Sequence, residues 1–282
     1  MSRNCMQILT LGNSYTWSLR SYFPAVVASV GDEVKLEFAN FGGCELARHW
    51  SYITAEERDE RCRIYDGGNR KLRDILASRP WDIVTIQQSS RDCWRLESFE
   101  PYTANIIAYI RTHAPGAEIV IQQTWAYRAD HPHFLPGSAW DIDQPTMFRL
   151  LTECNRTVAQ RYGLRLIPTG LAVELSRRGE TAPFVNYEPQ LPAPLHWPDL
   201  PPQAGDVVGQ CHWRKNPATG ELEIDRDLIH LNARGEYLQA CVWLATLFQR
   251  PTAAVTFVPD EIGNADAAFL RTAAQQAVDE YR

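Results

Sequence analysis

The sequence predicts an α/β protein in which a parallel sheet of about five strands is covered by helices on both faces. Short runs of β-branched and other apolar residues alternate along the chain with longer amphipathic segments. Glycine or proline lies at the end of several of these segments, where an element is expected to stop. Because neighbouring parallel strands need helical crossovers, this alternation predicts a doubly wound, three-layer α/β/α sandwich.

The expected elements follow one another in the order of a flavodoxin-like fold. The predicted strands are residues 7–11, 34–40, 81–87, 118–123 and 164–168. The predicted helices are a segment from Ser14 to a stop at Gly31, then residues 71–77, 102–112, 148–162, 233–248 and 266–281. Apolar residues at helical spacing, such as Leu19, Phe23 and Val26, support the first helix, although Pro24 lies near its middle.

The chain is expected to form one domain over residues 1–282, which is a suitable length for a single α/β unit. Two stretches, at about 126–144 and 180–223, lack a clear pattern. The second is rich in proline and tryptophan, and long ordered loops are often functional. We therefore predict an irregular insertion that packs over an edge of the sheet.

Composition excludes several classes of function. The formal net charge is −6 and there is no basic run, so nucleic acid is not expected as a partner. No apolar stretch is long enough to cross a membrane. The first strand follows the N-terminus closely, which predicts a cytoplasmic protein, or a secreted or periplasmic one if a signal was removed. Nothing in the sequence indicates an oligomeric state.

The cysteines also limit the possible functions. There are seven, an odd number, and they form no CxxC pair or zinc-like spacing. We expect free thiols, with neither a metal site nor a cofactor. His131 and His133 do not change this expectation, since two histidines without thiolate or carboxylate support are a poor ligand set.

Polar and glycine-rich residues follow the predicted strands. They are Gly12-Asn13-Ser14, Asn40-Phe41-Gly42-Gly43, Gln87-Gln88-Ser89-Ser90 and Gln122-Gln123-Thr124-Trp125. In an open parallel sheet these carboxyl ends lie at one edge, where ligands bind. The edge carries little charge, which suits stabilisation of a transient oxyanion better than binding of a permanent phosphate.

One serine, one histidine and one aspartate have the pattern of a nucleophilic site. A serine hydroxyl needs an imidazole to take its proton, and the imidazole needs a carboxylate to hold its tautomer. Ser14 follows the first strand, while Asp227 and His230 are three residues apart near the other end of the chain. Asp225 is an alternative to Asp227, at a less favourable spacing.

Two blocks of sequence resemble the SGNH (GDSL-type) hydrolase superfamily. The stretch from Ile8 to Thr16, which contains Gly12-Asn13-Ser14, is similar to its first block, with Asn in place of the usual Asp before the serine. Asp227-Leu228-Ile229-His230 is similar to its last block. The resemblance implies that Ser14, His230 and Asp227 form a catalytic triad. It also implies a serine esterase that removes a small acyl group, often acetyl, from a carbohydrate through an acyl-enzyme intermediate.

The oxyanion hole is where the sequence departs from that superfamily. The backbone N–H groups of Ser14 and Gly43, or Gly42, are the expected donors. The superfamily's third donor is an asparagine after the third strand, where this chain has Ser89-Ser90-Arg91-Asp92. We predict that the side-chain amide of Gln88 replaces it, because that amide is an equivalent donor.

Trp125 and Tyr127 are predicted to bind substrate, because aromatic faces stack on sugar rings or acyl groups. His49 is predicted to bind substrate as a wall of the pocket, because it follows the glycines after the second strand. Two alternatives remain open. One is a lipid, aryl or thioester hydrolase that uses the same triad. The other is a catalytically weak, carbohydrate-binding relic of a hydrolase, and the altered block after the third strand is what favours it.

Overall fold

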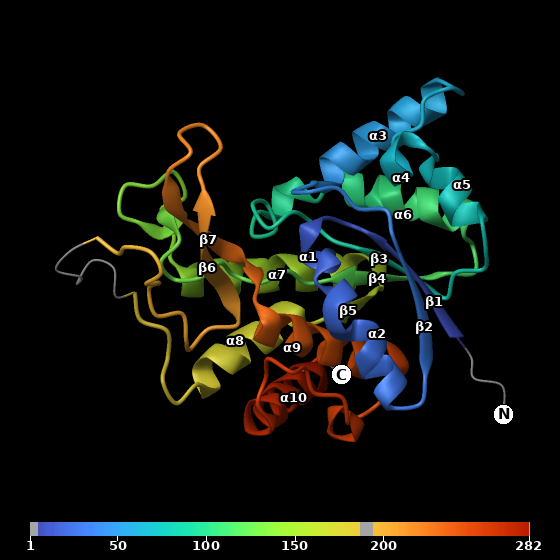
Figure 1. The fold of residues 1–282 in the computed structure, drawn as a ribbon. Coiled ribbons are helices and arrows are strands. Elements are labelled where there is room, and N and C mark those ends of the chain that lie inside the picture. The colour runs from blue at the N-terminus through green and yellow to red at the C-terminus, as the bar shows by residue number, and fades with distance from the viewer. Residues whose placement is uncertain (1–4, 187–193, 282) are drawn as a thin grey trace.

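The computed structural model describes residues 5–186 and 194–281, and its core is the predicted α/β/α sandwich (Figure 1). A five-stranded parallel sheet has the strand order β2-β1-β3-β4-β5, which is the flavodoxin-like order. Its strands are β1 (Cys5–Leu11), β2 (Glu33–Phe38), β3 (Ile83–Ile86), β4 (Glu118–Gln122) and β5 (Arg165–Ile167).

Four of these strands end one or two residues earlier than predicted. After β2, β3 and β4, a polar residue that was predicted to belong to the strand instead points its side chain at a neighbouring loop or helix. Asn40 Nδ2 donates to the Asn13 carbonyl, Gln87 Nε2 donates to Asn13 Oδ1, and Gln123 Oε1 accepts from the Leu171 N–H. The carboxyl ends of the strands are therefore cross-linked to one another and to the helices that follow.

Alternate residues of each strand face opposite helical layers, as the pleat requires. Ile8 of β1 belongs to one buried cluster and Leu9 to the other. The helices of the first layer are α2 (Leu19–Ser29), α8 (Thr169–Gly179), α9 (Ala233–Trp243) and α10 (Asn264–Asp279). Those of the second are α3 (Leu46–Arg58), α5 (Leu72–Ala77) and α6 (Tyr102–His113), while α7 (Gln144–Tyr162) contributes to both clusters.

Several helix boundaries differ from the prediction. Helix α7 begins earlier, at Gln144, because Asp143 accepts a hydrogen bond from the Thr146 N–H and caps the helix. Helices α3 and α8 were not predicted, and α9 continues into a π-helix at Leu244–Phe248. The remaining short elements are α1 (Ser14–Trp17), α4 (Tyr65–Gly68) and 3₁₀ turns at Leu96–Ser98, Pro132–Phe134 and Thr252–Ala254.

The region at 180–223, predicted to be irregular, contains part of an antiparallel hairpin, which corrects that prediction. Strands β6 (Val208–Lys215) and β7 (Leu222–Leu231) form a second sheet that projects from the body (Figure 1). Two of the prolines that suggested an insertion, Pro189 and Pro192, lie outside the described residues.

Two arginines, the buried Arg128 and the largely buried Arg177, fasten this hairpin to the sandwich. Arg177 on α8 pairs with Asp206 at 3.0 Å, and Asp206 also accepts from the Val208 N–H. Arg128 lies beneath Gly209, whose φ is +87°. A Cβ at Gly209 would lie 3.0 Å from the Asp227 carbonyl oxygen and 3.1 Å from Arg128, so glycine allows the close approach here.

Over the described ranges, no helix is long and apolar enough to cross a membrane. All seven cysteines are free thiols, and five of them are buried.

Candidate active site

The first strand delivers Ser14 to the edge of the sheet at the start of a helix. Strand β1 ends at Leu11, and Asn13 caps α1 by accepting a hydrogen bond from the Tyr15 N–H. Ser14 is thus the first residue of α1, and none of the described residues accepts a hydrogen bond from its backbone N–H. A free N–H at a helix N-terminus is suited to negative charge.

The end of β7 delivers the aspartate and the histidine together. Asp227 Oδ1 accepts hydrogen bonds from the backbone N–H groups of Ile229 and His230, at 3.0 and 2.9 Å. Its other oxygen, Oδ2, lies 2.7 Å from His230 Nδ1. The three-residue spacing is explained by this turn, in which one carboxylate holds both the backbone and the ring of the histidine.

Ser14 and His230 are separated by 216 residues in sequence, yet His230 Nε2 lies 2.8 Å from Ser14 Oγ. Since an ionised carboxylate only accepts, Nδ1 of a neutral His230 carries the proton. Nε2 then presents its lone pair to the serine hydroxyl. His230 is therefore placed as a base for the Ser14 hydroxyl, and Asp227 is placed to orient and stabilise the imidazolium that forms.

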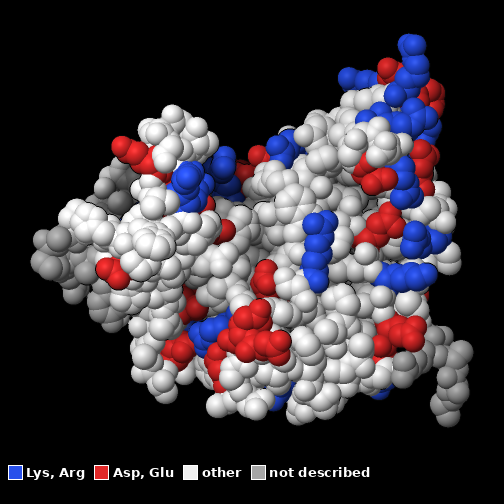
Figure 2. Space-filling view, viewed as in Figure 1, with Lys and Arg blue, Asp and Glu red and all other residues white. Residues whose placement is uncertain are grey.

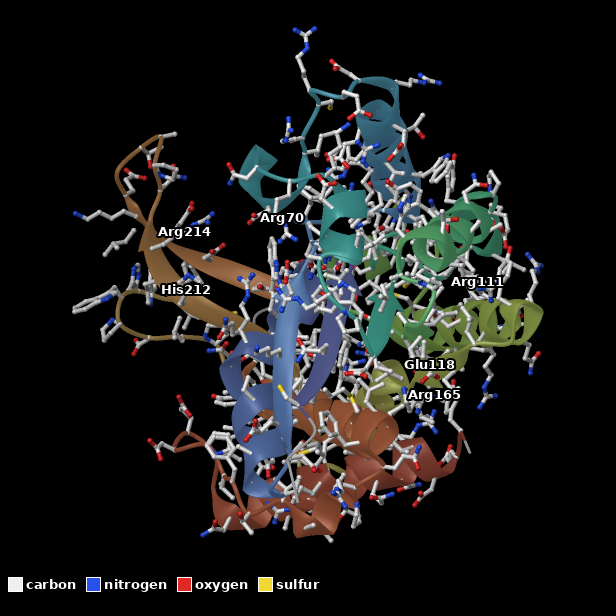
Figure 3. The ribbon with its side chains drawn as sticks, turned by 90° about the vertical axis from the view of Figure 1, so that its right-hand side faces the viewer. Arg70, Arg111, Glu118, Arg165, His212 and Arg214 are labelled. Atoms are coloured by element: carbon white, nitrogen blue, oxygen red, sulfur yellow. The ribbon has the colours of Figure 1, made fainter. Side chains whose placement is uncertain are left out.

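Asp227 is held in its ionised form. Burial alone would raise its pKa, but the hydrogen bonds from the His230 ring and from two backbone N–H groups outweigh that effect and lower the pKa to about 2. The alternative, Asp225, lies elsewhere on β7. His212 and Arg214 project from the hairpin (Figure 3), and they approach Asp225 Oδ2 at 3.5 and 3.1 Å.

Asn13 joins the ends of several strands around Ser14. Its Oδ1 accepts from Gln87 Nε2 at 2.5 Å, and its Nδ2 donates to the carbonyls of Cys44 and Gln88 at 3.1 and 3.4 Å. We did not predict this role, although an asparagine directly before a helix is a common N-cap. All of its side-chain hydrogen-bonding groups are engaged, so Asn13 fixes the position of the turn that carries Ser14.

The loop after β2 presents Gly43, the second predicted oxyanion donor. Gly43 has φ +57°, a conformation that favours glycine. Arg48 Nη2 donates to the Gly42 carbonyl at 2.7 Å. A trans peptide directs its N–H opposite to its C=O, so this bond turns the Gly43 N–H away from Arg48. Within the described part of the chain, that N–H has no acceptor.

The structure contradicts the prediction that Gln88 is an oxyanion donor. Gln88 is buried, and its Nε2 donates to both the backbone oxygen and the hydroxyl of Ser98, at 2.9 and 3.1 Å. Its Oε1 accepts from the N–H groups of Leu46 and Ser89. With its donors and its acceptor all engaged, Gln88 ties the start of α3 to the loop after β3.

His49 is not a substrate residue either, because it is fully buried beneath the nucleophile turn. Its Nε2 lies 2.9 Å from the Gly12 carbonyl, and its Nδ1 lies 3.1 Å from the Tyr65 hydroxyl. Burial lowers the pKa of His49 to about 4, so the ring is neutral at pH 7. Because a carbonyl only accepts, Nε2 carries the proton and Nδ1 accepts from Tyr65.

Trp125 was also predicted to bind substrate, but it is fully buried. Its Nε1–H donates to the Ile229 carbonyl at 2.9 Å, and its ring stacks on Tyr15. Tyr127 is buried as well, and its hydroxyl lies 2.9 Å from Ser90 Oγ. Neither indole nor phenol lies open to a ligand, so both predictions are corrected: these residues support the walls of the site.

An aromatic group next to Tyr127 is more accessible. His131 and Trp140 pack against Tyr127 at ring-centroid distances of 4.5 and 5.5 Å, and the exposed His133 lies on Trp140 at 4.3 Å. No group of His, Cys, Asp and Glu in the described ranges has the arrangement of a metal site.

A Ser–His–Asp hydrogen-bonded chain at the carboxyl edge of a flavodoxin-like sheet is the arrangement found in serine hydrolases. The chain belongs to the family described as "Domain of unknown function (DUF4886)", whose model matches residues 7–187. The matched range includes Ser14 and ends before Asp227 and His230. None of the curated proteins matches the chain.

Solved structures share its fold. A DUF4886 family protein from Bacteroides uniformis is 21% identical, with a TM-score of 0.71 over 98% of this chain and 95% of that one. A protein from Slackia heliotrinireducens, described as a candidate SGNH hydrolase, is 21% identical, with a TM-score of 0.54 over 86% of this chain and 100% of that one. The fold is that of the SGNH hydrolases.

Proposed function

We propose that this protein is a serine esterase that removes a small acyl group, acetyl, from a carbohydrate or a related alcohol. The observation that carries ester hydrolysis is the continuous hydrogen-bonded chain from Asp227 through His230 to Ser14, at 2.7 and 2.8 Å. Serine, imidazole and carboxylate in this order are what acyl transfer through a covalent intermediate requires.

In the first half of the reaction, His230 Nε2 takes the hydroxyl proton as Ser14 Oγ attacks the ester carbonyl carbon. The tetrahedral oxyanion is stabilised by the free N–H groups of Ser14 and Gly43. His230 is then an imidazolium, and the ionised Asp227 stabilises it. Its Nε2–H protonates the leaving alcohol as the C–O bond breaks, which leaves an acyl group on Ser14.

In the second half, water takes the place of the alcohol. His230 accepts a proton from the water as it attacks the acyl carbon, and the same two N–H groups hold the second oxyanion. When the intermediate collapses, the proton passes to Ser14 Oγ and the carboxylic acid leaves. No metal, cofactor or oxidant is consumed in this cycle.

The base of the triad is open to solvent, because the His230 side chain is 38% exposed. On the face in Figure 2 the molecule is hollowed between the hairpin and the α3 side, with charged side chains of both signs around the rim. The partly exposed faces of His131 and Trp140 are suited to packing on a sugar ring. The proposal that the acyl group is acetyl is supported by the sequence resemblance alone.

One observation favours a second candidate, a lipid or other long-chain acyl ester. Among the described residues, four of the five exposed large hydrophobic side chains lie between residues 185 and 222: Val185, Trp197, Leu200 and Leu222. Trp197 is 65% exposed. Exposed apolar side chains of this kind can pack on an acyl chain.

Hydrolysis of p-nitrophenyl acetate tests the esterase proposal. We expect Ser14→Ala and His230→Ala each to lower kcat by about 10³-fold or more, because triad members act as a unit. Ser51→Ala and His212→Ala are matched controls on the surface and should keep the wild-type rate. Equal rates in all five proteins would refute the triad, and inactivity of the wild type towards every ester would favour a binding relic.

A panel of acetylated sugars and of p-nitrophenyl esters of increasing chain length separates the two substrate classes. If the substrate is an acetylated carbohydrate, kcat/KM should be highest for the sugar acetates and fall with chain length. A kcat/KM that rises to eight carbons or more would favour the long-chain candidate instead.

A further inference from the structure

The segment that follows β4 runs beside the turn that carries Asp227 and His230. Trp125 Nε1–H donates to the Ile229 carbonyl at 2.9 Å, and the Arg128 backbone N–H donates to the Leu228 carbonyl at 3.0 Å. Leu228 and Ile229 are the two residues between the aspartate and the histidine. Both carbonyls of the turn are therefore held by residues 125–128, which belong to the main sandwich.

The same indole also contacts the residue next to the nucleophile. The rings of Trp125 and Tyr15 stack with centroids 4.0 Å apart and planes 3° from parallel. Tyr15 directly follows Ser14, and its ring meets the His230 ring edge-on at 5.7 Å. Trp125 and Tyr15 are both almost completely buried, so neither ring has room to move independently.

The contacts of Trp125 matter because the nucleophile and the base of the triad lie on different sheets. Ser14 follows β1 of the five-stranded sheet, while Asp227 and His230 lie on β7 of the projecting hairpin. Hairpins that project from a core move more easily than the strands of the core. The 2.8 Å contact between His230 Nε2 and Ser14 Oγ persists only if the hairpin is held in place.

We propose that Trp125 is a positioning residue, which fixes His230 against Ser14 through its bond to Ile229 and its stack on Tyr15. The inference rests on the proposed esterase function. A misplacement of about 1 Å between reacting groups can cost about 10²-fold in rate. Loss of the indole contacts should therefore lower the chemical rate while leaving substrate binding in place.

Trp125→Phe is the most direct test, because phenylalanine keeps a ring on Tyr15 but removes the N–H that holds Ile229. We expect kcat for p-nitrophenyl acetate to fall by about 10-fold to 10²-fold, with KM within about twofold of wild type. A kcat within twofold of wild type would overturn the proposal.

Trp243→Phe is the matched control. Trp243 is also fully buried, and no described residue accepts a hydrogen bond from its Nε1. The same substitution there removes the same atoms from the core without removing a hydrogen bond. We expect a smaller loss of stability in urea than for Trp125→Phe, because no hydrogen bond is lost, and an unchanged kcat. If Trp243→Phe lowers kcat as much as Trp125→Phe does, general loosening explains the effect and the positioning role is wrong.

The rate of covalent labelling by a fluorophosphonate separates this inference from the proposed function. Ser14→Ala should not be labelled at all, and labelling of that variant at the wild-type rate would refute the nucleophile itself. If Ser14→Ala is unlabelled while Trp125→Phe is labelled as fast as wild type, the triad stands and the positioning role fails. We expect Trp125→Phe to be labelled about tenfold or more slowly.

Tyr15→Leu provides a second variant if Trp125→Phe does not fold. It removes the stack but keeps the Trp125–Ile229 bond. We expect kcat to fall by about tenfold with KM unchanged, because His230 loses its edge contact and Trp125 loses its support. A kcat within twofold of wild type in a folded Tyr15→Leu variant would also overturn the proposal.

Discussion

Acidification should destabilise this protein before its carboxylates are protonated, because His49 is buried in its neutral form. Its pKa is lowered from 6.5 to about 4 by burial. In the unfolded chain the same imidazole titrates at about 6.5. A group whose pKa is depressed on folding contributes stability that is complete above the unfolded value and is lost as the pH falls towards the folded one.

The size of the effect follows from these two pKa values. Between about pH 7.5 and pH 5, His49 becomes protonated in the unfolded state but stays neutral in the folded state. The free energy of unfolding therefore falls by about 2 kcal/mol over this range. His49 is fully buried, so solvent does not screen this energetic cost. Asp227 has a pKa of about 2, so its protonation lowers the free energy of unfolding only below about pH 5 and does not affect the difference between about pH 7.5 and pH 5.

Urea unfolding of the wild type and of His49→Gln at both pH values tests this reasoning. Glutamine does not titrate, and its amide can donate to the Gly12 carbonyl as His49 Nε2 does. The pKa of His131 is also lowered to about 4, but His131 is present in both proteins and its contribution cancels in the difference. We expect the wild type to lose about 2 kcal/mol more than the variant. Equal losses in the two proteins would refute a neutral His49.

Three further substitutions test other parts of the site. Asp227→Asn should lower kcat by about 10⁴-fold, because the amide cannot fix the tautomer of His230, and kinetics with p-nitrophenyl acetate measure this. Gln88→Ala should lower the urea midpoint by an amount equivalent to about 1–3 kcal/mol, because the Leu46 N–H and the Ser98 oxygens lose a buried partner; unchanged stability with a slower kcat would restore it as an oxyanion donor. Asp206→Ala should cost about 3–5 kcal/mol, since the largely buried guanidinium of Arg177 then loses its carboxylate, and calorimetry would contradict this if the melting temperature did not fall.

Most of the sheet was predictable because each strand carries a local signal. Residues 118–123 are a short apolar run bounded by turn residues, and β4 is found at Glu118–Gln122. The hairpin was missed because β6 and β7 carry no such run. Strand β6 contains His212, Arg214 and Lys215, and its pairing with β7 and its anchoring by Arg128 and Asp206 replace the missing hydrophobic pattern.

The sequence by itself determined the α/β class, the five strands of the central sheet and, through the family resemblance, the three candidate catalytic residues. Each follows from a signal within a few residues, such as the three-residue spacing of Asp227 and His230. Only the tertiary structure decided which polar and aromatic residues are free to act. Trp125, His49 and Gln88 have the chemistry of ligand-binding groups, but they are buried with their hydrogen-bonding groups engaged. Burial and pairing depend on residues far away in the chain, and no local pattern encodes them.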